Sequence, residues 1–487
     1  MKIKLNSTGS LEALIKIIMA LFIVRLLFAG VQFIGFGLFS GLILAAFFVT
    51  SIFFFRRAIY RLIFGKKPEI LERVTIVHII ICAVLVRIIW SIIFHPVPVS
   101  DFKLFWNSIQ NVLEGNGSVF DTKSPATVLF YAVFLKIYNH LFTAYLVNSV
   151  VAGFQIFLIY RITKALSSST DTSKISAIFY AFYPMGVAFS SVLSSEVVLV
   201  TCVLLMTDLA VHKRDVSTVN EIFTRKNLFT LMSIGLLMAF GFLGRTVLAV
   251  FAAALLLFWL INIEQRIKLK IVEWVLVGTV CLAALTPQIY YNYKVLNKLS
   301  VSPNPYGGYV LLFGTSRESN GAYNEKELEI ITEETGITDS ESLVELARKK
   351  ALERIKSNPV DFILFALGDK FVRIWGNDYY FWWTMNDLEI SKRGTLFYVL
   401  LLTQIYYYSL WLLFLLGLIY NFRKRMGWEL YFVFSVLGLA FLHLFFEAQP
   451  RYHLPVMPFV CIVAAMAMAQ LYHKAKEFRK SDLLQEE

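Results

Sequence analysis

The sequence predicts an all-α polytopic membrane protein, and three observations carry that prediction. Of the 487 residues, 57% are hydrophobic and only 16% are charged, whereas a soluble chain of this size needs far more polar surface. Apolar runs of about 20 residues, the length that crosses a bilayer as a helix, recur along the chain. The basic residues lie mostly in short loops between these runs, as membrane orientation requires. The net charge of +12 therefore reflects topology, and no nucleic acid partner is expected.

Two apolar spans open the chain, at about residues 11–33 and 35–55. Five basic residues follow them closely, namely Arg56, Arg57, Arg61, Lys66 and Lys67. The positive-inside rule places this basic loop, and with it the N-terminus, in the cytoplasm. A third span, residues 74–94, then runs outward and delivers the next segment to the extracytoplasmic side.

The segment after the third span has the pattern of a helix that lies in the membrane interface. Pro96 and Pro98 end the span because proline has no backbone N–H to donate, and Ser100 stands where a helix N-cap would stand. Apolar residues then recur at helical spacing, namely Phe102, Phe105, Trp106, Ile109 and Leu113. Trp and Phe on one face favour an interfacial position. Asp101, in the first turn, would be a carboxylate at the membrane surface, and we interpret it as the catalytic residue. Its alternative role is to complement the helix dipole.

The first external loop, residues 95–142, contains a second apolar stretch, 125–138, that either crosses the bilayer or lies flat. We expect it to lie flat, because the basic residues of the following loop then stay in the cytoplasm. The next two spans are 144–162 and 175–192. Further spans follow, each crossing in the opposite direction to the one before, to a total of about twelve. The last of them ends in a basic tail, residues 473–480, which places the C-terminus in the cytoplasm as well.

This pattern divides the chain into four regions. An N-terminal pair of spans occupies residues 1–73, a transmembrane core 74–291, an extracytoplasmic segment 292–394, and C-terminal spans with a cytoplasmic tail 395–487. The extracytoplasmic segment is too long for an ordinary connection. Its stretches 325–334 and 341–356 are rich in helix formers and predict solvated helices, while 306–313 reads as a short strand or turn. Dense aromatic residues at 379–383 suggest an interfacial plate.

Charged residues at the outer ends of the predicted spans are the candidates for chemistry, because such charges are costly unless they are paired or wetted. Asp101 would accept the proton of an acceptor hydroxyl. Arg245 and Arg451 would bind a donor phosphate through planar guanidinium groups. Lys294 and Lys370 are further phosphate candidates. A second group would bind the acceptor or the sugar, namely Glu196, Tyr452 and His453.

Several of these residues also have a structural alternative. Glu196 is either an acceptor ligand or a solvated residue at a helix start. Arg245 is alternatively a snorkelling anchor at the membrane surface, and Arg451 alternatively pairs with Glu447. Lys294 and Lys370 are alternatively solvated or snorkelling side chains. The four cysteines all lie in apolar spans, which favours packing over disulfides or a metal site.

Several motifs in this order resemble a known group of membrane enzymes. The motifs are Ser100-Asp101-Phe102, the flat stretch after Pro125, Tyr183-Pro184 with Ser195-Glu196, Gly244-Arg245, Pro287 through Asn292, the phrase GTSRESNGAYN at 314–324, Ala351 to Lys370, and Glu447 followed by Arg451-Tyr452-His453-Leu454-Pro455. The chain resembles the GT-C superfamily of membrane glycosyltransferases. Within it, the nearest group is the bacterial family 39 members, relatives of the protein O-mannosyltransferases and the lipid A aminoarabinose transferase.

The resemblance implies a GT-C-like helical bundle and an inverting transfer from a polyprenyl-phosphate sugar on the extracytoplasmic face, with the first-loop acid of the family at Asp101. It also implies that residues 1–73 are an addition before the usual core. Phe102 stands where the family has a second acidic residue, so a protein acceptor of the O-mannosyltransferase kind is not expected. For the same reason a divalent metal is not favoured, since one carboxylate is a poor cage, and no other cofactor is implied.

The sequence therefore predicts a multi-pass glycosyltransferase of the cell membrane. Its partners would be a polyprenyl-phosphate sugar donor, the lipid bilayer, and a cell-envelope acceptor that is a glycan, a lipid or a glycopolymer. One alternative is a transporter or flippase of a lipid-linked saccharide, for which broken helices near the midplane and related halves are typical. Another is a polysaccharide polymerase or ligase, which would use the same donor class.

Overall fold

The computed structural model describes residues 7–33, 73–214, 216–261, 267–303, 307–336, 340–378, 393–420 and 427–483. These ranges hold helices and their connections and contain no strand, which confirms the all-α fold class. Among the described residues, six helices are long and apolar enough to cross a membrane, and three shorter helices are apolar. The protein is therefore a multi-pass membrane protein. The count of about twelve spans stays a prediction, and the second predicted span, 35–55, lies outside the described residues.

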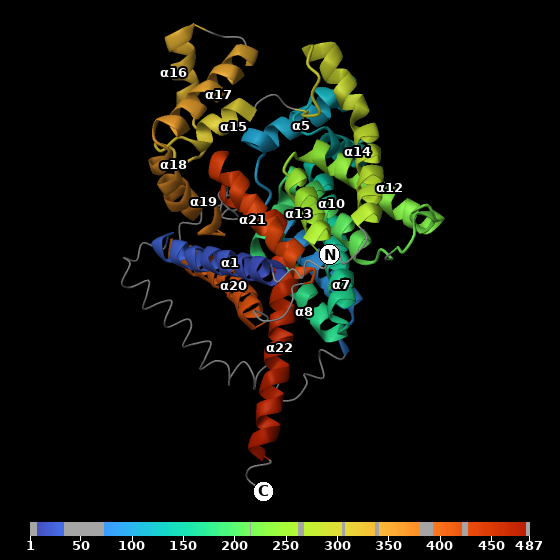
Figure 1. Ribbon diagram of the computed structural model, residues 1–487. Coiled ribbons are helices and arrows are strands. Elements are labelled where there is room, and N and C mark those ends of the chain that lie inside the picture. The colour runs from blue at the N-terminus through green and yellow to red at the C-terminus, as the bar shows by residue number, and fades with distance from the viewer. Residues whose placement is uncertain are drawn as a thin grey trace.

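A bundle of long helices forms the body of the molecule, and a smaller group of helices gathers at one end of it (Figure 1). The helices of the bundle are α1 (Ser7–Phe33), α4 (Ile76–Ile93), α7 (Leu141–Ser167), α8 (Thr170–Ala181), α10 (Ser195–Val211), α12 (Arg225–Gly244), α13 (Leu248–Ile261), α14 (Ile267–Leu296), α20 (Arg393–Tyr420), α21 (Glu429–Phe445) and α22 (Met457–Leu483). The chain order does not set the packing, since α22 packs against α20 and α8, and α13 against α21. Backbones approach closely where glycine permits it: a Cβ at Gly235 of α12 would lie 2.7 Å from the carbonyl oxygen of Val277 in α14.

The predicted fifth span, 175–192, is wrong as a single helix. Helix α8 ends at Ala181, and α9 (Pro184–Ala188) and the 3-10 turn η2 (Phe189–Ser191) follow it. The break precedes Pro184 because the proline ring disfavours helical geometry in the preceding residue, and Tyr183 is extended. The buried Arg87 of α4 binds the end of α8, with Nη1 donating to the Ala181 carbonyl at 2.8 Å. Arg87 thus satisfies a backbone carbonyl group at the break.

The predicted first external loop, residues 95–142, contains two separate helices. Helix α5 (Ser100–Leu113) buries Phe102, Phe105 and Ile109 on one face, as its spacing predicts. The N-cap is Val99 rather than Ser100, and Asp101 lies in the first turn. The loop continues through η1 (Val119–Asp121) to α6 (Pro125–Leu135), whose 11 residues extend only about 16 Å. That length is shorter than the hydrocarbon core of a bilayer, so α6 does not cross it.

The predicted extracytoplasmic segment contains helices that pack on one another beside the bundle. They are α15 (Gly307–Gly314), α16 (Glu325–Thr335), α17 (Ser340–Ser357), α18 (Pro359–Phe365), the π-helical turn η3 (Ala366–Lys370) and α19 (Phe371–Trp375). The two predicted helices at 325–334 and 341–356 are confirmed. Within the stretch 306–313, residues 307–313 lie in helix α15 instead of a strand or turn. Gly308 allows α15 to contact α17, since a Cβ there would lie 2.1 Å from the Val344 carbonyl oxygen. The aromatic residues at 379–383 lie outside the described residues.

Candidate active site

Four charged residues from distant parts of the chain meet at one place. Asp101 comes from α5, Glu196 from the first turn of α10, and Arg245 from the C-cap of α12. Arg451 comes from η5 (Pro450–Val456), the turn that leads into α22. Arg451 Nη2 lies 2.8 Å from Asp101 Oδ2, and its Nε lies 3.5 Å from Glu196 Oε1. Arg245 Nη1 also pairs with Glu196 Oε1, so the arginines and carboxylates form one continuous chain of ion pairs.

Lys123 completes this cluster and escaped the sequence analysis. Its Nζ lies 2.7 Å from Asp101 Oδ1, so Asp101 is held between Lys123 on one side and Arg451 on the other. Lys123 stands in the short turn between η1 and α6, in the same loop region as Asp101. The only feature of the sequence that could have indicated Lys123 is its place in a polar turn directly before Pro125, in the same loop region as Asp101. Nothing in residue spacing alone shows that the loop folds back onto its own start.

Electrostatics keep Asp101 ionised. Partial burial raises the pKa of its carboxyl, but the charges of Lys123 and Arg451 outweigh this effect and lower the pKa to about 2. Three cations, Lys123, Arg245 and Arg451, face two carboxylates, Asp101 and Glu196. The cluster therefore carries a net charge of +1 and suits an anion of single charge.

Aromatic rings support the two arginines. The guanidinium carbon of Arg451 lies 4.7 Å from the ring centroid of Phe102, and that of Arg245 lies 4.9 Å from the ring centroid of Tyr452. The ring of His443 stacks on the ring of Tyr452, with centroids 4.7 Å apart. These contacts fix the planes of both guanidinium groups. Tyr452, a predicted acceptor ligand, thus lies in the cluster and contacts Arg245.

His453 belongs to a separate, fully buried network. Its Nδ1 lies 2.8 Å from the Ile374 carbonyl oxygen and its Nε2 lies 3.1 Å from Asp378 Oδ1. Because a carbonyl can only accept, Nδ1 carries a proton. The hydroxyl of Tyr183 also donates to Asp378 Oδ1, at 2.7 Å. The network joins the break after α8, the end of α19 and the turn η5 that carries Arg451.

The remaining predicted residues lie elsewhere. Lys370 is fully buried, and its Nζ donates to the carbonyls of Gly314 at 2.7 Å and Leu444 at 2.9 Å. Burial lowers the pKa of Lys370 to about 7, against the opposing effect of Glu447. Lys294 lies in the last turn of α14, with its ammonium 5.8 Å from the Tyr290 ring centroid. The structure therefore groups neither lysine with Asp101.

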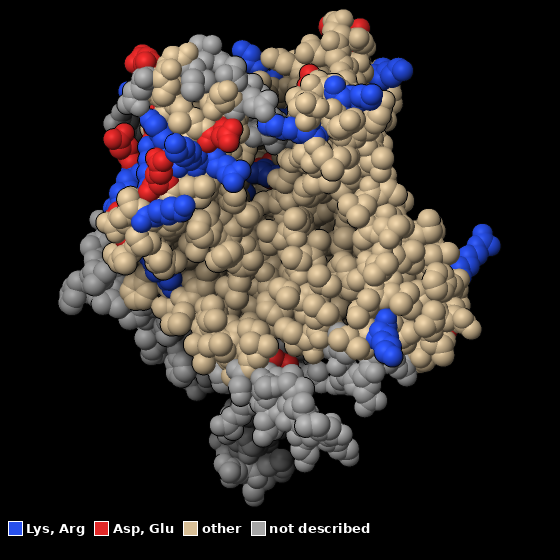
Figure 2. Space-filling view, turned by 45° about the horizontal axis from the view of Figure 1, so that its top comes forward, with Lys and Arg blue, Asp and Glu red and all other residues tan. Residues whose placement is uncertain are grey.

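The charged side chains are unevenly spread over the surface. Figure 2 shows lysine and arginine residues gathered in the upper part of one face, around a hollow. Below them lies a broad band with few charged residues, which is the kind of surface that a bilayer covers.

Comparisons with known proteins agree with this architecture. A family model described as dolichyl-phosphate-mannose-protein mannosyltransferase matches residues 122–291. The solved structure of the archaeal oligosaccharyltransferase AglB from Archaeoglobus fulgidus, in complex with an inhibitory peptide and a dolichol-phosphate, is similar with a TM-score of 0.50 and 11% identity. The similarity covers 84% of this chain and 52% of that one. The GT-C resemblance is confirmed.

A second structure shows the same relationship to the GT-C fold. It is the Archaeoglobus fulgidus oligosaccharyltransferase tethered to an acceptor peptide that contains the NVT sequon. It has a TM-score of 0.50 and 13% identity, and the similarity covers 83% of this chain and 50% of that one. This chain thus spans about half the length of the solved structures that it matches. No curated protein sequence matches it.

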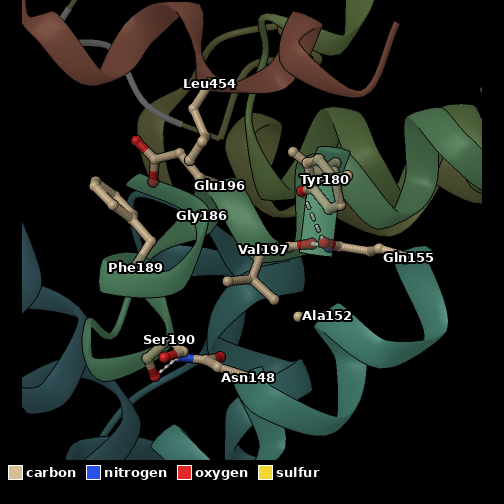
Figure 3. Close-up of a pocket in the computed structure, with 11 residues that line it drawn as sticks. Asn148, Ala152, Gln155, Tyr180, Gly186, Phe189, Ser190, Glu196, Val197 and Leu454 are labelled. Atoms are coloured by element: carbon tan, nitrogen blue, oxygen red, sulfur yellow. Dashed lines mark hydrogen bonds between the residues drawn. The ribbon is translucent and has the colours of Figure 1, made fainter. Parts of the chain in front are cut away.

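A small cavity lies beside Glu196, one member of the ion-pair cluster (Figure 3). Its volume is about 30 Å³, and Glu196 lines it together with Asn148, Gln155, Tyr180 and Ser190. Polar side chains in its wall bond to one another, as Tyr180 does to Gln155 at 3.0 Å. The space suits a buried water and is too small for a sugar. Among the described residues, no group of three or more His, Cys, Asp or Glu side chains is placed to hold a metal ion.

Proposed function

We propose that this GT-C protein transfers a sugar from a polyprenyl-phosphate donor to a cell-envelope acceptor, with Asp101 as the base. The supporting observation is the position of Asp101, a partly exposed carboxylate held between Lys123 and Arg451 at the edge of an ion-pair cluster. The acceptor is a glycan, a lipid or a glycopolymer. The reaction inverts the anomeric centre and takes place on the extracytoplasmic face, with both chain termini in the cytoplasm.

The donor phosphate binds to the cations of the cluster. A polyprenyl-phosphate sugar is a phosphodiester with one negative charge, which matches the net charge of +1 on the cluster. Arg245 and Arg451 have planar guanidinium groups that can each bind two phosphate oxygens, and Lys123 adds a point charge. Lys370 instead anchors the external segment to the end of α21 through its two carbonyl contacts.

The chemistry follows from these charges. The acceptor hydroxyl attacks the anomeric carbon, its new carbon–oxygen bond forms, the bond to the phosphate oxygen breaks, and the hydroxyl proton moves to Asp101. With a pKa of about 2, Asp101 is a weak base, so the proton moves late, when the bond to the phosphate has largely broken. A direct displacement of this kind inverts the sugar.

The charge of the cluster changes in step with that of the leaving group. When Asp101 accepts the proton, its negative charge disappears and the net charge of the cluster rises from +1 to +2. At the same moment the phosphodiester becomes a phosphomonoester, whose charge approaches −2. The cations therefore stabilise the charge that develops in the transition state more strongly than that of the ground state. Glu196 and Tyr452 remain available to bind sugar or acceptor hydroxyls, while His453 positions η5.

The test uses purified protein in proteoliposomes with a panel of undecaprenyl-phosphate sugars and a cell-envelope extract as acceptor. The release of free lipid phosphate is measured for the wild type, for Asp101→Asn, and for Glu114→Gln as a matched control on the same loop. We expect one donor to be consumed by the wild type and the control, and at least 100-fold more slowly by Asp101→Asn. Consumption by Asp101→Asn at the wild-type rate would contradict the role of Asp101.

A flippase remains the alternative outcome, because the break between α8 and α9 is a feature that transporters use. In this chain the break lies beside a cavity of only about 30 Å³, which holds no saccharide. If no donor is consumed, but labelled lipid-linked sugar changes leaflet only when the protein is present, the transport function replaces the transferase.

A further inference from the structure

The predicted extracytoplasmic segment contains a second cavity that the proposed reaction does not use. Its volume is about 320 Å³, which lies within the range of small-molecule sites. Its walls come from three places: the turn after α15, helix α16, and the junction between α17 and α18. These elements are solvated helices without a catalytic role in the transfer, so the cavity needs an explanation of its own.

Two ion pairs form the polar walls of this cavity. Arg317 donates to both carboxylate oxygens of Asp361, at 2.9 and 2.6 Å. Arg354 Nη2 lies 3.1 Å from Glu327 Oε1. The side chains of Arg317 and Asp361 are about half exposed, at 51% and 48%, so water already competes for them and ligand hydroxyls can do the same. Each guanidinium keeps further donors and each carboxylate further acceptors.

A buried hydroxyl in the wall lacks a partner. Ser316 is only 2% exposed, and its Oγ has no hydrogen-bond partner among the described residues. A buried polar group in that state is costly unless a ligand or water satisfies it. Phe362 and Phe365 form the apolar part of the wall. Donors, acceptors and an apolar floor together are what a sugar ring requires, with its hydroxyl rim and its C–H face.

The charge of the lining restricts the ligand further. Three carboxylates, Glu318, Glu327 and Asp361, outnumber the two arginines, so the cavity carries a net charge of −1. A phosphate or a sulfate would be repelled, whereas a neutral or an amine-bearing saccharide would not. The cavity is therefore complementary to a different ligand class from that of the Asp101 cluster, whose net charge is positive.

The turn that lines the cavity also reaches the catalytic cluster. Its residue Gly321 accepts a hydrogen bond from Ala448 N at 2.7 Å, three residues before Arg451. Tyr323 follows in the same turn. Partial desolvation raises the pKa of its hydroxyl, and the negative charges of Glu325, Glu447 and Asp101 raise it further. The chain from Ser316 to Tyr323 thus leads from the cavity to the surroundings of Asp101.

We propose that this cavity binds a neutral or amine-bearing saccharide unit of the acceptor, away from the hydroxyl that reacts at Asp101. This assignment rests on the proposed function and names the class of its acceptor: a glycan or a glycan-bearing molecule of more than one unit. The cavity determines which acceptor is chosen, and the Asp101 cluster performs the transfer.

The test measures binding without any donor. The full chain in lipid nanodiscs is mixed with methyl glycosides of glucose, galactose, mannose, N-acetylglucosamine and glucosamine, and with glucose 6-phosphate as an anionic probe, and saturation-transfer NMR is recorded. We expect at least one glycoside to give a signal in the wild type. Ser357→Trp, which places a bulky ring at the cavity wall, and Asp361→Asn should each reduce it at least fivefold. Lys349→Trp, on the same helix but outside the lining, should leave it unchanged.

Three results would overturn the assignment: no glycoside gives a signal, the signal survives both cavity variants, or glucose 6-phosphate gives the strongest signal. Gel filtration and thermal unfolding show whether each variant is folded, and the two cavity variants act by different means, one by bulk and one by charge. Donor consumption is measured separately in proteoliposomes, so a failure of the transferase function and a failure of this cavity give different results.

Discussion

The two cations beside Asp101 affect its role as a base in two opposite ways. Lys123 and Arg451 keep it ionised, with a pKa of about 2, and so ready to accept a proton at any physiological pH. The same two cations make it a weak base, and they are also the groups that a donor phosphate would contact. A donor that draws Lys123 away from Asp101 therefore strengthens the base at the moment when the substrate is bound.

Replacing Lys123 tests this arrangement. Lys123→Met removes the strongest contribution that lowers the pKa of Asp101 and one phosphate contact. We expect the KM for the donor to rise about tenfold, which corresponds to about 1.4 kcal/mol, with a smaller change in kcat. The pKa of Asp101 moves upward, so the activity is lost at a higher pH than in the wild type when the solution is acidified.

Steady-state kinetics over a range of pH, with Lys136→Met as a control on the same loop, measures both effects. An unchanged KM together with an unchanged acidic limb would show that Lys123 has no part in donor binding.

The element that matters most at the next scale is η5, because it carries Arg451 and Tyr452 into the cluster and His453 away from it. The buried pair of His453 and Asp378 holds this turn against the end of α19, and Tyr183 ties both to the break after α8. A buried pair of this kind contributes little net stability when both partners are present, but the loss of one partner is costly. The pair therefore fixes the position of the turn.

Asp378→Leu should destabilise the protein by about 3 kcal/mol, because it leaves the His453 imidazole buried without its partner. Tyr183→Phe should cost only about 1 kcal/mol, the value of one hydrogen bond. The double variant Asp378→Leu/His453→Leu should recover part of the loss, since two apolar side chains replace the pair. Equilibrium unfolding in mixed micelles measures these three variants together with the single variant His453→Leu. A loss in the double variant equal to the sum of the losses in Asp378→Leu and His453→Leu would contradict the coupling.

At the scale of the whole molecule, α5, which carries Asp101, and the helices α15 to α18 lie toward one end of the bundle, while the C-terminal end of α22 extends in the opposite direction (Figure 1). This arrangement agrees with a topology in which the C-terminus and the active site lie on opposite sides of the membrane. The orientation itself rests on the basic residues of the loops, and it can be tested directly.

Single cysteines introduced into a variant that lacks the four native cysteines report the orientation. Lys356→Cys, at the end of α17, should react with a membrane-impermeant maleimide in intact cells. Lys226→Cys, at the start of α12, should react only after the cells are permeabilised. The reverse pattern would invert the topology and place the transfer in the cytoplasm.

Much of the molecule could be predicted from the sequence alone. Hydropathy determines the helical membrane fold because the polar backbone groups of an apolar segment in lipid must form their hydrogen bonds within the helix. The 3.6-residue period similarly determines α5, its buried face and the position of Asp101 in the first turn. Charges at span ends pointed to Asp101, Glu196, Arg245 and Arg451, because a charge at a membrane edge is expensive without a partner.

Only the tertiary structure decided which of these charges meet. Lys123 joins Asp101 because a loop folds back, whereas Lys370 turns inward to two carbonyls and His453 to Asp378, although the sequence marks all of them alike as polar residues near membrane ends. The break in the predicted fifth span and the cavity beside Arg317 depend on the same kind of contact. Periodicity and hydropathy describe how one segment meets its solvent, but the partner of a side chain hundreds of residues away is set by packing, which no local pattern contains.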